Sequence, residues 1–163
     1  MDRIPPPNST VKNPRLVIGI GNKYRGDDGV GGYTARKIAE NGLKEVKVVE
    51  DRGESIHLMD MWDSADEVVL IDAVVSGQKA GTVHRFEVSE NPLPKEYFPN
   101  FSTHTFSIAD SIELARALDR LPAKLTVYGI EVNDFTAGEQ LSPVAMQGAN
   151  EAVTMILQEL TKT

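Results

Sequence analysis

The sequence contains no cysteine among its 163 residues. A disulfide scaffold, a thiolate zinc site and a cysteine nucleophile are therefore excluded. No apolar run approaches the ~20 residues that a helix needs to span a bilayer. Residues 1–9 also lack the apolar core of a signal peptide. These absences predict a cytoplasmic protein.

Basic residues are outnumbered, with 17 Lys and Arg against 24 Asp and Glu, which gives a net charge of −7. Non-specific binding to nucleic acids or to anionic membranes needs a positive field, so neither is expected. The length suits one domain that buries its core without cross-links. We expect a flexible, proline-rich lead-in over residues 1–14 and a single α/β domain over residues 15–163.

Apolar runs alternate with helical patterns in the first half of the chain. Strands are predicted at 15–20, 46–51 and 68–74, with helices at 29–41 and 55–65 between them. This β-α-β-α-β order predicts parallel strands joined by right-handed crossovers. The third strand is apolar almost throughout, so we expect it near the centre of the sheet.

The pattern changes after the third strand. The link at 76–81 is rich in turn residues and too short for a parallel crossover, so the strand at 82–88 should run antiparallel at or near an edge. A helix from about Thr105, a strand at 125–130 and a last helix opened by Pro143 follow. The predicted fold is a three-layer αβα domain with a five-stranded, mostly parallel twisted sheet.

The spacing of apolar residues predicts which helix faces meet the core. In the helix at 55–65, the predicted face consists of Ile56, Met59 and Trp62. In the helix from about Thr105, it consists of Ile108, Ile112, Ala115 and Leu118. Each set is expected to be buried.

A glycine-rich, acidic loop follows the first strand, from Gly19-Ile20-Gly21 to Gly26-Asp27-Asp28-Gly29. It loosely resembles a nucleotide-binding loop, but the dinucleotide-binding spacing requires glycine where Tyr24 stands. Two carboxylates at a helix N-terminus would also repel a pyrophosphate. Nucleotide binding through this loop is kept as an alternative, and the acidic pair favours a cation. The simplest structural reading is that Asp28 caps the following helix.

Two other residues extend this candidate site. Asp72 lies at the carboxyl end of the predicted central strand, the edge at which open α/β sheets bind ligands. A buried carboxylate is rare unless it is paired or metal-bound. His104 lies between a proline-rich loop and the next helix. With Asp28, these residues would supply two carboxylates and an imidazole, a donor set that suits Zn²⁺ or Ni²⁺.

The remaining polar candidates are less specific. Asp51 ends the second strand and is expected either beside the other carboxylates or capping the next helix. His57 is expected to face solvent, and His84 lies on the edge strand with either face possible. The chain has neither a G-x-S-x-G elbow nor an H-E-x-x-H motif. A hydrolase on this chain would therefore lack a self-contained peptidase signature.

The ordered motifs resemble those of the hydrogenase maturation endopeptidases. The matching stretches are Ile18-Gly19-Ile20-Gly21-Asn22, Gly26-Asp27-Asp28-Gly29-Val30-Gly31, Val69-Leu70-Ile71-Asp72-Ala73-Val74, Gly81-Thr82-Val83-His84-Arg85-Phe86, Ser102-Thr103-His104, Tyr128-Gly129-Ile130-Glu131 and Leu141-Ser142-Pro143. The resemblance implies an endopeptidase that removes a C-terminal extension from the precursor of the nickel–iron hydrogenase large subunit, after nickel insertion. The chain departs from the family where Gly53-Glu54 replaces the commoner Gly-Thr.

The resemblance also implies roles for the candidate residues. Asp28, Asp72 and His104 would contact the metal, and Asp28 and Asp72 would also serve catalysis. Asp28 stands where Glu is common in the family, and Asp27 is the less favoured neighbour. Asp51 matches an acidic position associated with activity and is the first candidate for a general base. Nickel would arrive with the precursor, so no organic cofactor is expected, and the protein would act as a monomer. A non-catalytic chaperone for nickel or the precursor is the other alternative.

Overall fold

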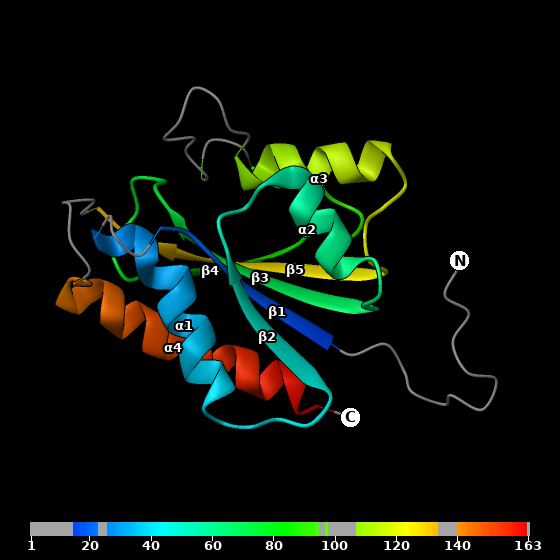
Figure 1. The fold of residues 1–163 in the computed structure, drawn as a ribbon. Helices are drawn as coiled ribbons and strands as arrows, with labels where there is room; N and C mark the ends of the chain where they lie inside the picture. Colours follow the sequence, from blue (N-terminus) through cyan, green and yellow to red (C-terminus); the bar gives the residue numbers. More distant parts are fainter. Residues whose placement is uncertain (1–14, 23–25, 95–96, 98–106, 134–139, 163) are drawn as a thin grey trace.

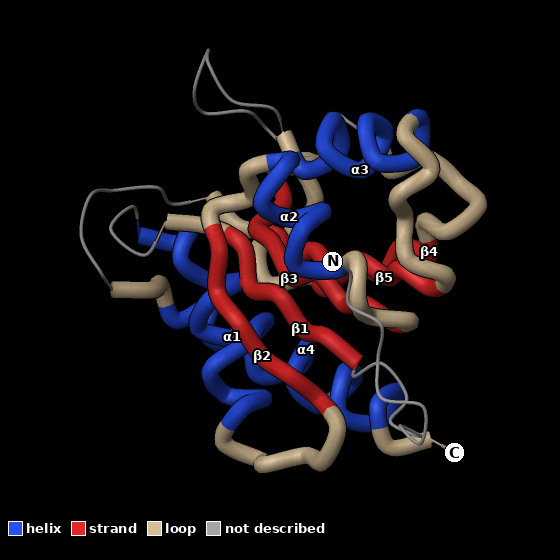
Figure 2. Tube along the Cα trace, turned by 45° about the vertical axis from the view of Figure 1, so that its right-hand side comes forward, coloured by secondary structure: helices blue, strands red, loops and turns tan. Residues whose placement is uncertain are grey.

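The computed structural model describes residues 15–22, 26–94, 97, 107–133 and 140–162. Its elements are β1 (Arg15–Ile20), the 3₁₀ helix η1 (Gly26–Gly29), α1 (Val30–Ala39), β2 (Val46–Asp51), α2 (Ser55–Trp62), β3 (Glu67–Val74), β4 (Val83–Glu87), α3 (Ile108–Ala117), β5 (Lys124–Glu131) and α4 (Pro143–Leu160). Helices α1 and α4 cover one face of the sheet, and α2 and α3 cover the other (Figures 1 and 2). The predicted three-layer αβα architecture is confirmed.

The five strands lie in the order β2-β1-β3-β5-β4. All neighbouring strands are parallel except β4, which runs antiparallel to β5 at the edge. Both the central place of β3 and the direction of β4 agree with the sequence prediction. No helix in the described part of the chain is long and apolar enough to cross a membrane.

Side chains of β3 alternate between two cores. Val68 and Leu70 pack beneath α2 and α3, while Val69 and Ile71 pack beneath α1 and α4. Because successive strand residues point to opposite faces, Asp72 belongs to the α2/α3 face. A carboxylate thus continues an apolar row of the sheet at its carboxyl end.

Two helix N-termini are fixed by their own side chains. Ser107 caps α3 and forms a capping box with Asp110. Ser142 caps α4 through the backbone N–H of Ala145, and Pro143 occupies the first turn as predicted. Both caps satisfy backbone donors that would otherwise lack a helical partner.

The prediction that Ile56 and Leu118 are buried in the core is wrong. Ile56 is 58% exposed and Leu118 is 51% exposed. In an α-helix, residues three positions apart fall about 60° short of a full turn from each other. Ile56 and Trp62 are two such steps apart, so their side chains point about 120° apart and cannot share a narrow face. Leu118 follows the last residue of α3 as its C-cap, beyond the regular turn.

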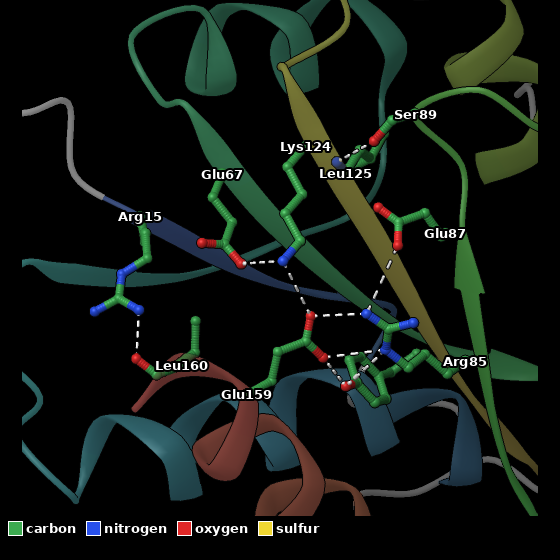
Figure 3. Close-up of polar contacts among 10 residues, drawn as sticks. Arg15, Glu67, Arg85, Glu87, Ser89, Lys124, Leu125, Glu159 and Leu160 are labelled. Carbon is green, nitrogen blue, oxygen red and sulfur yellow. Dashed lines mark hydrogen bonds and ion pairs between the residues drawn. The ribbon is translucent and has the colours of Figure 1, made fainter. Parts of the chain in front are cut away.

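A charged cluster joins the C-terminal part of α4 to the sheet (Figure 3). The Glu159 carboxylate accepts hydrogen bonds from Arg85 at 2.9 and 3.1 Å and from the Tyr128 hydroxyl, and it lies 3.8 Å from Lys124 Nζ. Burial acts to raise the pKa of Glu159, but the bonds from Arg85 and Tyr128 outweigh it, so the pKa is lowered. Burial and Glu159 raise the pKa of Tyr128 to about 12.

Replacing Glu159 with Gln is expected to lower the unfolding free energy by about 1.5–3 kcal/mol near neutral pH, because charge-assisted hydrogen bonds are lost. The pKa of Glu159 is lower in the folded state, so its contribution is present above the unfolded value of roughly 4.3. That contribution disappears as pH falls through the folded pKa. Urea denaturation across this range measures the difference, with the exposed Glu151→Gln on the same helix as control. An equal loss in acid and at neutral pH would contradict the electrostatic explanation.

Candidate functional site

The side of the sheet on which successive strands are added changes at β1. From β1 it passes through α1 to β2 on one side, then through α2 to β3 on the other side of β1. These two crossovers lie on opposite faces of the sheet (Figure 1). This reversal is a topological switch point, and doubly wound folds bind ligands outside the carboxyl ends of the two strands that flank it, here β1 and β3. We refer to this position as the crevice.

A single transverse row of residues crosses the sheet just below this crevice. Ile20 pairs with Asp51, Asp72 pairs with Gly129, and Gly129 pairs with His84. The last recorded β1–β3 pair joins the residues immediately before Ile20 and Asp72, which places these two side by side. Paired residues point to the same face, so Asp51, Asp72 and His84 all face α2 and α3. We call the row that Asp51, Ile20, Asp72, Gly129 and His84 form across the sheet the carboxyl-end row.

Asp28 reaches the crevice from η1, directly after β1. Its carboxylate accepts a hydrogen bond from the backbone N–H of Asn22 at 3.0 Å. Gly21 packs so closely that a Cβ there would lie 2.0 Å from the Asp28 carbonyl oxygen. Helix α1 has Gly29 as its N-cap and no side-chain cap. The simpler reading of Asp28 as the cap of this helix is therefore wrong.

Asp27 has a separate, structural position. It is 1% exposed, and its two carboxylate oxygens accept hydrogen bonds from the backbone N–H and the hydroxyl of Ser142, each at 2.7 Å. Ser142 is the N-cap of α4, so Asp27 ties the acidic loop to that helix. The two adjacent aspartates thus have different roles. Asp27 is a structural residue, whereas the charge of Asp28 acts on Asp72.

Electrostatics at the crevice disfavours two bare carboxylates. Burial raises the pKa of Asp72 well above its ordinary value, and the negative charge of Asp28 raises it further. The backbone N–H of Ala73, which donates to Asp72 at 2.8 Å, acts in the opposite direction. A cation placed between the carboxylates would relieve this repulsion.

The third predicted donor, His104, lies outside the described residues. Within the residues that are described, no group of three or more His, Asp or Glu side chains is arranged to hold a metal ion. Of the three predicted donors, Asp28 and Asp72 lie on elements that pack against each other, η1 and β3. The assignment of the full set stays a prediction.

Asp51 forms a pair that the sequence analysis missed. Its side chain is 7% exposed; one oxygen accepts the Gly53 N–H at 2.7 Å, and the other lies 2.5 Å from His57 Nδ1. Helix α2 begins after Glu54 without a side-chain cap, so Asp51 does not cap it. His57 faces solvent as predicted, yet it is held by a buried carboxylate. No motif signals this contact, which depends on the turn between β2 and α2.

His84 also contacts a buried carboxylate. The 1% exposed Glu131 accepts hydrogen bonds from the backbone and hydroxyl of Ser76 at 2.6 Å, and its oxygen lies 2.9 Å from His84 Nε2. The His84 ring packs against Phe86 and Tyr97. Burial acts to raise the pKa of Glu131, but the bonds from Ser76 and His84 outweigh it and lower the pKa. This cluster fixes the link between β3 and β4 beside the crevice.

Hydrogenase maturation proteins are among the known proteins that this chain resembles in sequence and fold. The family model for hydrogenase maturation proteases matches residues 33–159. The hydrogenase expression/formation protein HupD of Thiocapsa roseopersicina is 29% identical over 154 residues, which cover 90% of this chain and 67% of that protein. The HybD maturation protease of Thermococcus kodakarensis has a TM-score of 0.65 at 27% identity and covers 91% of this chain and 99% of its own. The HybD endopeptidase of Escherichia coli, at 22% identity, shares the fold with a TM-score of 0.74 over 90% of this chain and 91% of its own. The chain belongs to the hydrogenase maturation protease family.

Proposed function

We propose that the protein is an endopeptidase that removes the C-terminal extension from the precursor of a nickel–iron hydrogenase large subunit. The observation that supports this most directly is the packing of η1, which carries Asp28, against β3, which carries Asp72, while Asp27 is engaged by Ser142. Two neighbouring carboxylates in a crevice favour a cation over a phosphate. The family supplies the class of reaction, which is proteolysis.

Nickel carried by the precursor is the cation in this proposal. Asp28, Asp72 and His104 would offer two carboxylates and one imidazole, an incomplete coordination shell that leaves positions for ligands from the substrate. Docking of the metal would fix the scissile bond in register by proximity. The metal would also polarise the scissile carbonyl or activate a water molecule. Metal-dependent recognition then explains why cleavage would follow nickel insertion.

The rest of the proposal concerns partners and setting. The precursor is the protein partner, and the peptidase acts on it as a monomer in the cytoplasm. A net charge of −7 disfavours nucleic acid as a partner. A non-catalytic chaperone and a nucleotide-binding protein are the two other functions that the test below separates from ours.

Cleavage of a nickel-loaded precursor tests the proposal. The purified protein is incubated with cognate large-subunit precursor, either nickel-loaded or metal-free, and intact masses are measured. We expect loss of a C-terminal fragment from the nickel-loaded precursor and none from the metal-free form. Binding of the loaded precursor without any mass loss would favour the chaperone function. Thermal stabilisation by ATP or NAD, with no response to precursor, would favour nucleotide binding.

A further inference from the structure

We propose that His57 is the general base of the cleavage reaction and that Asp51 orients it. The inference rests on the proposed protease function and names the group that accepts the proton of the attacking water. It is carried by the contact between the Asp51 carboxylate and the His57 imidazole, at 2.5 Å. It also reverses the sequence-based expectation that Asp51 itself would be the base.

The Asp51 carboxylate is poorly placed to take a proton from water. Its side chain is 7% exposed, and both oxygens have partners, the Gly53 N–H and His57 Nδ1. Its backbone is fixed as well, because the Asp51 carbonyl accepts the N–H of Gly21 at 3.0 Å. A carboxylate held in this way is suited to orienting a neighbour rather than to contacting solvent.

The His57 imidazole has the complementary properties. Its side chain is 58% exposed, whereas the nitrogen that meets Asp51 is Nδ1. A carboxylate beside Nδ1 favours the neutral tautomer that is protonated at Nδ1, and this tautomer leaves Nε2 unprotonated and able to accept a proton. This pairing is the arrangement expected of a general base and its orienting group.

The pair lies beside the crevice that holds Asp28 and Asp72. Asp51 and Asp72 belong to the carboxyl-end row and are separated by one strand, β1. Neighbouring strands are about 4.8 Å apart, so the two Cα positions are about 10 Å apart. The side chain of Ile20 lies between them in the same row, so Asp51 and Asp72 flank β1 at the carboxyl end of the sheet. His57, in the first turn of α2, contacts Asp51 on the β2 side of this row.

The proposed step is balanced. His57 Nε2 takes a proton from water as the water oxygen bonds to the scissile carbonyl carbon. The resulting imidazolium then gives that proton to the departing amide nitrogen as the C–N bond breaks. The first products are a carboxylic acid on the mature subunit and an amine on the released extension. The acid then loses its proton to the solvent or to the amine, and no oxidant or reductant is needed.

The decisive variant is His57→Ala, measured by single-turnover cleavage of nickel-loaded precursor. We expect a rate loss of about 10²–10⁴-fold, the usual contribution of general base catalysis, with precursor binding unchanged. Added imidazole should restore part of the rate, because it can occupy the vacated space. Asp60→Ala, one turn along the same helix and 64% exposed at its side chain, is the matched control and should cleave normally.

Asp51→Asn tests the orienting role. An amide in place of the carboxylate favours the wrong tautomer of His57, so we expect a comparable rate loss that imidazole does not restore. Glu50→Gln is the matched control, since Glu50 adjoins Asp51 on β2 and pairs with Arg36 of α1 instead. Normal cleavage by His57→Ala, or a loss that imidazole does not rescue, would overturn the proposal. If the wild-type protein does not cleave its precursor, the proposed protease function itself fails.

Discussion

Asp72→Asn is expected to abolish precursor processing while leaving the protein at least as stable as the wild type. Activity falls because a proposed nickel contact is lost, and the loss should exceed the ~100-fold typical of residues that only support a metal ligand. Stability does not fall, because burial and the charge of Asp28 both disfavour the ionised carboxylate of Asp72. Removing that charge relieves an existing repulsion. A substitution that lowers activity while it maintains or raises stability is characteristic of a functional site.

The adjacent aspartates provide the matched comparison. Asp28→Asn should also abolish processing and leave the thermal midpoint unchanged or higher. Asp27→Asn should lower the midpoint, because an amide cannot accept both bonds that Ser142 donates to the carboxylate. Mass spectrometry of the precursor and thermal denaturation of each variant give the two readouts. If Asp28→Asn processes normally while Asp27→Asn does not, the wrong aspartate has been assigned to the metal.

Gly31→Ala is expected to destabilise the protein by about 3 kcal/mol or more, at the upper end of overpacking effects. Gly31 lies in the first turn of α1, where the helix meets the carboxyl ends of β1 and β3. A Cβ there would lie 2.4 Å from the carbonyl oxygens of both Ile20 and Ile71. Neither backbone can move without disturbing the sheet, so α1 must shift and displace Asp28 with it. Reduced precursor processing should accompany the loss of stability.

The neighbouring Gly32 is the control. A Cβ at Gly32 would lie 2.6 Å from Glu50 Oε1, at the end of a flexible side chain on the surface. That side chain can move, and alanine favours a helix over glycine by about 1 kcal/mol. Gly32→Ala should therefore be nearly neutral in urea denaturation. Equal stability of the two variants would show that α1 is not tightly seated on the strand ends.

The acidic loop shows where prediction from the sequence succeeded and where it stopped. Repulsion between carboxylate and phosphate identified the loop as a candidate cation site without any coordinates. The family resemblance favoured Asp28 over Asp27 as the metal contact, but the sequence did not reveal the structural role of Asp27, because its partner is Ser142, 115 positions away. The same limitation hid the pair formed by Asp51 and His57, which depends on how the chain turns from β2 into α2.

The sequence by itself determined the class of fold, the parallel order of the first three strands and the antiparallel edge strand. These follow from local periodicity, connection length and turn residues, all of which act over a few positions. Only the tertiary structure decided that Ile56 faces solvent and that Asp51 holds His57 beside the crevice. Such relations depend on how each helix is rotated and docked on the sheet, which packing between distant segments controls. The sequence therefore indicated which residue types form the candidate site. The register of the strands in the fold determined that Asp51 and Asp72 lie on the same face of the sheet.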